Sequence, residues 1–217
     1  MKKTEKRIML RFRLSEDTDA KLTNQSASER SYSKSGTDTK MLTIMSFGIA
    51  LNIICAFIAL TFRIPLYMDS IGTVLIAVTL GPKYAVMTGL CGSIISGTFD
   101  VYSLYFAPVQ ISTGLIAGLA YKKGLLEGKK IFTGTLCFSL PTAIISAAIA
   151  YFVFGGMTSA GSSYVVQFLG SIGVSKMATI FVIQIITEYF DKFLAAAIAV
   201  TVVNTVPKKF ILSNSGK

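Results

Sequence analysis

Long apolar runs separated by short polar breaks occupy most of the chain after residue 40. A helix needs about 20 apolar residues to cross a bilayer, and several of these runs reach that length. The run at 70–80 is too short to cross alone, so either its start lies below the membrane surface or residues 64–68 add depth to it. The pattern predicts an all-α integral membrane protein with six transmembrane helices. The predicted spans are about 41–62, 70–80, 84–96, 105–121, 131–154 and a segment within 176–206.

The break between the first two runs, residues 62–73, reads Phe-Arg-Ile-Pro-Leu-Tyr-Met-Asp-Ser-Ile-Gly-Thr. Pro65 disfavours helical backbone at Ile64 and has no N–H to donate. The first run therefore ends here, and the chain turns before the next run begins. We interpret this stretch as a loop at the outer face of a membrane bundle, forming one wall of a ligand site.

The two ends of the chain differ from its middle. Residues 1–40 are polar and rich in Ser, Thr and Lys, without a sustained apolar period. This composition favours a disordered, basic cytoplasmic tail. We expect a membrane substrate-binding domain over 41–209 and a short cytoplasmic tail over 210–217. Residues 165–175 fit either a helix at the outer face or the start of the last span.

Charge is scarce and unevenly distributed. Only 15% of the 217 residues are charged, against roughly 25% in a soluble domain, and the mean hydropathy is +0.62. Ten of the 21 Lys and Arg residues and six of the 11 Asp and Glu residues lie before residue 41.

Six spans sort the remaining loops into a basic side and a side that carries Arg63, Asp69 and Asp100. Positive residues mark the cytoplasmic side of a membrane protein. We therefore expect a multi-pass protein of the plasma membrane with both termini in the cytoplasm. The basic side holds Lys83, Lys122, Lys123, Lys129, Lys130, Lys208 and Lys209.

Several functional classes are disfavoured. The net charge of +10 does not indicate a nucleic-acid partner, because the basic residues alternate with acids in the tail or flank apolar runs. The three cysteines lie inside apolar runs without a CxxC pair, and the chain has no His. No Walker sequence or GxSxG motif is present. We therefore expect no catalytic residues, no metal, no cofactor and no ATPase site in this chain.

Polar and aromatic residues gather in the loops opposite the lysines. Ionisable groups at membrane depth usually face a cavity or a partner, and aromatic walls with a few polar groups are typical of a small-molecule pocket. An interfacial aromatic belt with acids in water is the alternative. The candidate substrate-binding residues from these loops are Arg63, Tyr67, Asp69, Asp100, Tyr102, Tyr105 and Gln167.

The last span adds further candidates. Glu188, Asp191 and Lys192 stand at i, i+3 and i+4, so they share one helix face, and Gln184 lies one turn earlier. Two interpretations remain open and are compatible. Glu188 and Lys192 can form a self-contained pair while Asp191 reaches a loop donor, or all three can line the floor of an outer cavity.

The first span carries small residues at four-residue spacing, Ser46 with Ala50 and Cys55 with Ala59. Such spacing lets helices approach closely in a membrane. These faces either pack inside this chain or dock a second protein.

The chain resembles the substrate-binding S components of energy-coupling factor (ECF) vitamin importers. The resemblance covers about residues 41–209 and rests on six predicted spans, a short second span and a basic loop before the fifth span. Residues 64–73 followed by Leu80-Gly-Pro look like the first loop and second helix of that family. Glu188-x-x-Asp-Lys192 is similar to its last-helix pattern.

The resemblance implies a function and partners. An S component captures a micronutrient in a pocket open to the outside and delivers it with a shared transmembrane subunit and two ATP-binding subunits. The family's first helix often carries an Ala-x-x-x-Ala docking motif, and Ser46-x-x-x-Ala50 departs from it by one residue. The outer acids outnumber the outer bases, which suits a neutral or cationic aromatic heterocycle, vitamin-like or nucleobase-like.

Two other classes stay open as alternatives. A membrane ligand-sensor module is disfavoured because only residues 207–217 follow the last span, too few for an output domain. A self-sufficient secondary transporter is disfavoured because the two halves show no internal repeat. Glu188, Asp191 and Lys192 are the residues that could form a proton relay in such a transporter.

Overall fold

The computed structural model describes residues 39–206. The predicted tails, 1–40 and 210–217, lie outside these residues except for Thr39 and Lys40, as do residues 207–209 at the end of the predicted membrane domain. The chain divides into two units, Met1–Leu42 and Thr43–Lys217, and the following concerns the second unit. Residues 39–206 contain helices, turns and loops but no strand, which confirms the all-α prediction.

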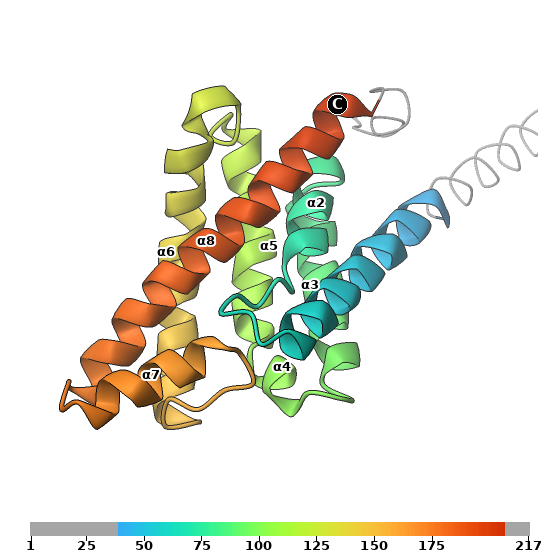
Figure 1. Ribbon diagram of the computed structural model, residues 1–217. Coiled ribbons are helices and arrows are strands. Elements are labelled where there is room, and N and C mark those ends of the chain that lie inside the picture. Colours follow the sequence, from blue (N-terminus) through green and yellow to red (C-terminus); the bar gives the residue numbers. More distant parts are fainter. Residues whose placement is uncertain (1–38, 207–217) are drawn as a thin grey trace, which may run out of the picture. The chain divides into compact units, whose positions relative to one another are not determined.

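The first described helix covers Thr39–Thr61. The others are α2 (Ile71–Thr79), α3 (Pro82–Ser96), α4 (Val101–Tyr105), α5 (Ala107–Lys122), the 3₁₀ turn η1 (Gly128–Lys130), α6 (Ile131–Phe152), α7 (Ser162–Ser171) and α8 (Lys176–Thr205). Figure 1 shows α4 and α7 at one end of this unit and the α5–α6 connection at the other. We call these the α7 end and the η1 end.

Most helices begin and end where the sequence breaks the apolar pattern. The first helix ends just before Pro65, α3 begins at Pro82, and α5 ends at Lys122. One short helix was not predicted as an element, and another matches one of two alternatives. The polar break before the fourth span contains α4, whose first turn is capped by the Asp100 side chain accepting from the Tyr102 N–H at 3.3 Å. The ambiguous segment 165–175 contains the end of α7, a helix separate from α8.

The helix α2 is only nine residues long, about 14 Å at 1.5 Å per residue. All its residues but Thr79 are buried, and it packs against α3, α5 and α8. Figure 1 shows it at the centre of the unit, with the loop 62–70 leading into it. This loop therefore enters the interior of the bundle instead of staying at its edge.

The helices α3 and α5 approach each other closely. A Cβ added at Gly114 would come within 2.8 Å of the Ala85 carbonyl carbon, and one at Gly118 would come as close to Pro82. Glycine therefore allows these two backbones to meet, as small residues do at membrane helix crossings.

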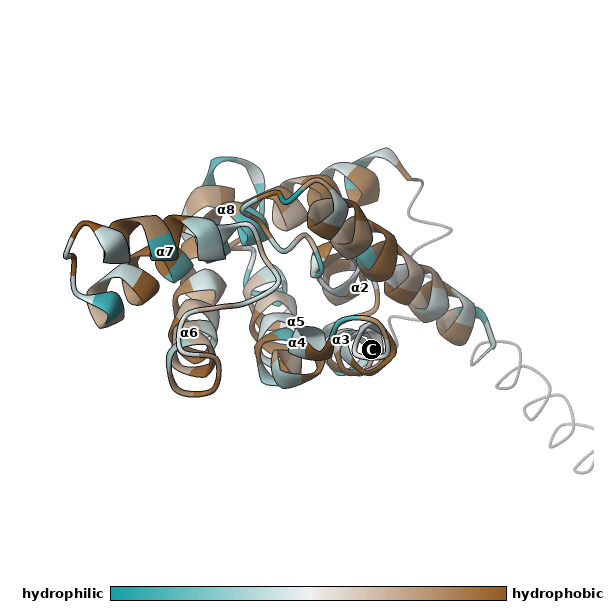
Figure 2. Cartoon of the chain, turned by 60° about the horizontal axis from the view of Figure 1, so that its bottom comes forward, coloured by the Kyte–Doolittle hydropathy of each residue, from teal (hydrophilic) through white to brown (hydrophobic). Residues whose placement is uncertain are grey.

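The outward faces of the helices are apolar. Large hydrophobic side chains lie exposed on α3, α5, α6 and α8, and Figure 2 shows hydrophobic residues (brown) along most of their length. Thr39–Thr61 and Gly128–Phe152 are long and apolar enough to cross a membrane by length and composition. The other helices are shorter or, in α8, carry three charges in mid-helix. On α6 the exposed residues are Phe132, Leu136, Leu140 and Ile144.

Candidate functional site

A layer of buried polar side chains crosses the interior between two apolar clusters. Along α8, Ile180 belongs to an apolar cluster near α7. Three alanines further along the helix, Ala195, Ala196 and Ala199, belong to a second apolar cluster near η1. Between them every buried side chain is polar or charged. We call these residues, with the polar side chains they contact, the polar layer; on α8 it comprises Gln184, Thr187, Glu188, Asp191 and Lys192.

The other helices repeat this order. In α5 the buried Gln110 and Thr113 separate Phe106 and Val109 from Ala117. In α6 Ser146 takes the corresponding place. Because several helices contribute hydrogen-bonded polar side chains, the layer is more than a single misplaced charge.

Lys192 is the centre of the charged part of the layer. Its Nζ lies 2.9 Å from Asp191 Oδ2 and 3.3 Å from Glu188 Oε2, and it donates to Ser70 Oγ at 3.1 Å. Each of the three charged side chains is 1–2% exposed. The i, i+4 pair that the sequence predicted is therefore present, inside the bundle and away from solvent.

Asp191 joins α8 to the loop 62–70. Its Oδ1 accepts from the Met68 N–H at 2.7 Å, and its Oδ2 accepts from Ser70 Oγ at 3.0 Å. The predicted loop donor for Asp191 is thus the backbone of Met68 together with the Ser70 hydroxyl. These bonds hold the loop against the middle of the 30-residue helix α8.

The loop adopts unusual backbone geometry where it makes these contacts. Arg63 and Met68 both have φ of 53°, in the left-handed region that side chains other than glycine rarely adopt. Each such residue costs of order 1 kcal/mol, so surrounding contacts must hold it in place. For Met68 that contact is its own N–H bond to Asp191.

Tyr67 forms the uncharged part of the layer. Gln184 Nε2 donates to the Tyr67 hydroxyl at 3.1 Å and to Ser146 Oγ at 2.9 Å. Burial raises the pKa of Tyr67 to about 12, so its hydroxyl is neutral. Its ring packs on Phe106 with centroids 5.6 Å apart. Tyr67 and Gln184 thus present both donors and acceptors beside an aromatic wall.

Asn52, on the first helix, caps α2. Its Oδ1 accepts from the N–H groups of Gly72 at 2.6 Å and Thr73 at 3.2 Å, which have no partner within α2. Its Nδ2 donates to Thr73 Oγ1 at 2.8 Å. Thr73 Oγ1 in turn donates to Gln110 Oε1 at 3.1 Å. The start of α2 is therefore held by side chains of two other helices.

Asp69 is half-buried beside the charged cluster. Gln110 Nε2 donates to its backbone carbonyl at 3.2 Å. Burial raises the pKa of its carboxyl to about 6, although the positive charge of Lys192 acts in the opposite direction. Asp69 is therefore a carboxyl group that changes charge close to neutral pH.

The remaining loop candidates lie nearer the α7 end. Asp100 Oδ2 accepts from Ser159 Oγ at 2.9 Å, and the Gly161 N–H donates to the Ile64 carbonyl at 3.3 Å. Tyr102 and Tyr105 pack on Phe154, with ring centroids 4.6 and 5.2 Å apart. These contacts connect the loops 62–70 and 153–161 over the polar layer.

Three candidates are exposed. Arg63 is exposed and its guanidinium lies 5.5 Å from the centroid of the Tyr164 ring. Gln167 is exposed on α7. Tyr105 is half exposed even though its ring contacts Phe154.

The predicted docking residues divide between two environments. Ser46 and Ala50 are exposed on the first helix, next to the exposed Phe47. Cys55 is half-buried, and Ala59 is buried within this chain.

Two small cavities lie between the polar layer and the α7 end. One has a volume of about 10 Å³ and is bordered by Tyr67, Gln184 and Ser162. The other has about 20 Å³ and is bordered by Tyr67, Asp69 and Asp100. Each holds one water molecule at most. The site is therefore closed in this structure, and a larger ligand would enter only if the two loops moved apart.

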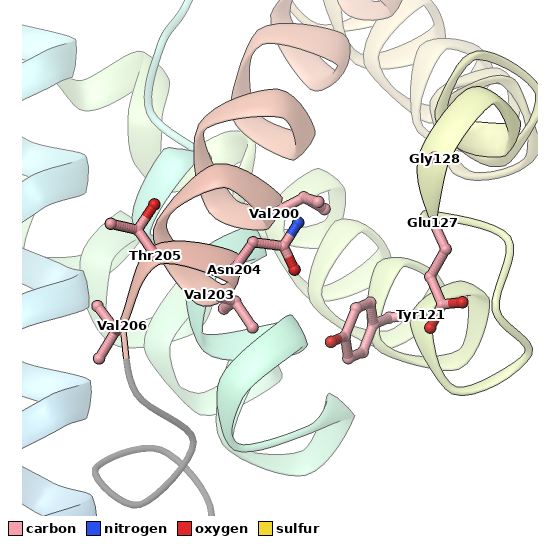
Figure 3. A pocket seen from close by; sticks show the side chains of 8 residues that line it. All are labelled: Tyr121, Glu127, Gly128, Val200, Val203, Asn204, Thr205 and Val206. Carbon is pink, nitrogen blue, oxygen red and sulfur yellow. The ribbon is translucent and has the colours of Figure 1, made fainter.

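A larger cavity of about 560 Å³ lies at the η1 end (Figure 3). Tyr121 and Glu127 border one side, and Val200, Val203 and Asn204 of α8 border the other. It extends to Val206, the last described residue. Its polar lining residues, among them Glu127, Asn204 and Thr205, form none of the buried ion pairs of the polar layer, which remains the stronger candidate site.

The side chains of the polar layer are of the kinds that bind small molecules. Residues 39–206 contain no cluster of three His, Cys, Asp or Glu side chains that could hold a metal. The layer offers carboxylates, an ammonium, amides and hydroxyls around aromatic rings, the usual composition of a site that orients a small molecule.

Sequence reasoning missed several residues that build this layer. Asn52 and Gln110 are isolated amides within apolar runs, and such isolation is itself a signal at membrane depth. Ser70 and Ser146 carry no such signal, because single hydroxyls are common in apolar helices. Their roles follow only from the three-dimensional contacts with Lys192 and Gln184.

Comparison of the chain with models of protein families, with curated proteins and with solved structures found no match.

Proposed function

We propose that this chain is the membrane substrate-binding subunit of an ECF-type, ATP-driven importer. It captures a vitamin-like or nucleobase-like micronutrient at the outer face and delivers it with a shared transmembrane subunit and two ATP-binding subunits. The observation that carries the proposal is the polar layer, a closed set of buried charges and amides beneath two connected loops. The resemblance of residues 41–209 to S components supplies the biological context.

The distribution of polarity supports a multi-pass membrane protein with six spans. Large hydrophobic side chains cover the outward faces of α3, α5, α6 and α8, while charges and amides lie inside. A soluble protein rarely exposes apolar surface on this scale. In a bilayer, the same arrangement is favourable, because polar groups then face partners or a cavity.

The lysines support an orientation with the η1 end in the cytoplasm. Lys122 and Lys123 end α5, and Lys129 and Lys130 lie in η1. The α7 end carries Arg63 and Lys176 together with Asp69 and Asp100. By the positive-inside rule, the α7 end faces outward and both termini are cytoplasmic.

The short helix α2 supports a ligand site at membrane depth. Non-helical backbone within a membrane is tolerated only where protein buries it or where it lines a cavity. The segment from Met68 to Ser70 meets this condition through its bonds to Asp191. Broken helices of this kind commonly form substrate sites in transporters.

Loading of the site requires the loops 62–70 and 153–161 to separate. This motion would break the backbone bond from Gly161 to Ile64, the bond from Ser159 to Asp100, the hydrogen bonds of Tyr67 with Thr158 and Ser162, and the stacking of Arg63 on Tyr164. The ligand would then replace part of the hydrogen bonding of Tyr67 and Gln184.

Uptake by reconstituted vesicles tests the proposal. The chain is co-expressed with the shared transmembrane subunit and the two ATP-binding subunits of its own organism. The complex is purified and placed in vesicles with ATP on the cytoplasmic side. We expect accumulation of a micronutrient that depends on ATP. Accumulation by the chain alone, driven by a proton gradient without ATP, would instead identify a secondary transporter.

A further inference from the structure

The polar layer holds more negative than positive charge. Asp69, Glu188 and Asp191 provide three carboxyl groups around Lys192. Within residues 39–206, Lys192 is the sole cation within ion-pair distance of Glu188 and Asp191, and Asp69 has no ion-pair partner. With all four groups ionised, the net charge would be −2, and an uncompensated buried charge is strongly destabilising.

Asp191 and Ser70 accept hydrogen bonds from two of the three N–H donors of Lys192. Both Asp191 oxygens are hydrogen-bonded, to the Met68 N–H, to Ser70 Oγ and to Lys192 Nζ. An ammonium has three donors, and Ser70 Oγ accepts another of them. The pairing of Asp191, Ser70 and Lys192 is therefore nearly saturated without a ligand.

Glu188 is left unsatisfied. Its Oε2 lies 3.3 Å from Lys192 Nζ, yet no donor within residues 39–206 makes an aligned hydrogen bond to that buried oxygen. A carboxylate can accept about four hydrogen bonds, and a buried one is costly to leave short of them. Glu188 Oε2 can therefore accept a hydrogen bond from a donor that a bound ligand supplies.

Asp69 has spare capacity too. Gln110 Nε2 donates to its backbone carbonyl at 3.2 Å, and the Gln110 side chain also hydrogen-bonds its carboxyl, which leaves other acceptor positions of that carboxyl open. Its carboxyl borders the 20 Å³ cavity beside Tyr67, on the side from which a ligand would enter. Two carboxyl groups with open acceptor positions therefore lie next to an aromatic wall.

Resting on the proposed function, we propose that the ligand is a small flat organic cation whose positively charged nitrogen group binds to Glu188 and Asp69. Such a group, amidinium-like or ring ammonium, supplies both the missing N–H donors and the missing positive charge. The rings of Tyr67 and Phe106 provide faces on which a cationic ring can pack. The competing way to neutralise the site is protonation of the two carboxyl groups, which would favour a neutral ligand.

Three probes of nearly equal shape separate these possibilities: benzamidinium, benzamide and benzoate. Their binding to the full chain in lipid nanodiscs is measured by ligand-detected nuclear magnetic resonance at neutral pH. We expect benzamidinium to bind at least about tenfold more tightly than benzamide, since a charged hydrogen bond contributes roughly 1.5–3 kcal/mol. We expect no binding of benzoate. Equal binding of the cation and the amide, preference for benzoate, or no binding of any probe would overturn the inference.

Two variants locate the effect, and a third controls for charge. Glu188→Gln and Asp69→Asn should each remove most of the preference for benzamidinium over benzamide. Glu127→Gln removes an acid at the η1 end and should leave the preference unchanged. If Glu188→Gln does not fold, Asp69→Asn still decides, because Asp69 lies in a loop. A preference that survives Asp69→Asn in a folded protein would contradict the assigned place of the cation.

Failure of this inference is distinguishable from failure of the proposed function. A chain that prefers benzoate but still assembles with ATPases and supports ATP-dependent uptake would keep the importer and lose the cationic ligand. A chain that selects benzamidinium but shows no ATP-dependent uptake with its partners would keep the cationic site and lose the importer.

Discussion

At the scale of single residues, the fold depends on a buried lysine that links two segments far apart in sequence. Lys192 contacts Ser70, which lies 122 residues earlier, as well as Glu188 and Asp191 on its own helix. Removing one partner of a buried ion pair usually destabilises a protein more than the pair stabilised it, because the other charge stays buried. Loss of Lys192 should therefore destabilise the fold, because its carboxylate partners would stay buried without a counter-charge.

Replacement of Lys192 by Met tests this dependence. We expect Lys192→Met to lower the free energy of unfolding by about 3–5 kcal/mol, since Glu188 and Asp191 then lose their counter-charge. Thermal unfolding in nanodiscs measures the effect. Lys123→Met, at the exposed end of α5, is the matched control and should change the midpoint little. Equal midpoints for both variants would show that the buried ion pairs do not support the fold.

Asp69 predicts a pH dependence of stability. Its pKa is raised from 3.8 to about 6, so the folded protein holds its proton more tightly than the unfolded chain does. This stabilisation is complete below about pH 4 and is lost as the pH rises through about 6. We expect the stability of wild type relative to Asp69→Asn to fall between these values. A difference that rises with pH, measured by thermal unfolding, would show that Asp69 is ionised throughout.

At the scale of elements, the distinguishing feature is the short helix α2, whose start lies inside the bundle. The N–H groups of Gly72 and Thr73 donate to Asn52 Oδ1 of another helix, whereas the N-cap residue of α2, Ser70, makes no side-chain cap bond. The Ser70 hydroxyl donates instead to Asp191. One helix cap is thus provided from outside so that Ser70 can take part in the polar layer.

Replacement of Asn52 by Ala tests the cap. We expect Asn52→Ala to destabilise the protein by about 1–2 kcal/mol, the usual cost of losing a cap, and to speed amide hydrogen exchange at Gly72 and Thr73. Asn204→Ala, an exposed asparagine on α8, is the control. Unchanged exchange at both amides would mean that Asn52 does not hold the start of α2.

The sequence predicts the apolar helices and part of the site, because these depend on local patterns. It does not predict contacts between residues far apart in the chain. Proline at 65 and 82 and the lysines at 122 and 123 mark helix ends locally, and the i, i+4 rule predicts the pairing of Glu188 with Lys192. The helix α7 was ambiguous because its Ser- and Gly-containing sequence has low helical preference. The bond from Ser70 to Asp191 spans 121 residues, and no local pattern encodes it.

At the scale of the whole molecule, large hydrophobic side chains lie on the outward faces of the helices and charged side chains lie inside, the reverse of a soluble protein. The exposed apolar face of the first helix carries Ser46 and Ala50. The same helix contacts the polar layer through a different residue, Asn52. Binding of ligand and docking of the shared subunit should therefore be separable by mutation.

Replacement of Ala50 by Leu tests this separation. We expect Ala50→Leu to spare ligand binding but to reduce recovery of the shared transmembrane subunit on pull-down, because the larger side chain keeps the two helices apart. Cys137→Leu adds similar bulk at an exposed position of α6 and serves as the control. Full recovery of the partner with Ala50→Leu would reject this docking face.

The central claim is that this chain carries a small molecule, and mass spectrometry of the compounds released from the purified protein tests it most directly. The protein is extracted in mild detergent, washed, and denatured in solvent, and the Asp69→Asn variant is treated in parallel. We predict a single micronutrient, close to one per chain in wild type and depleted in the variant. A wild-type protein that releases no compound, and takes up none from a mixture of vitamins and nucleobases, would contradict the account.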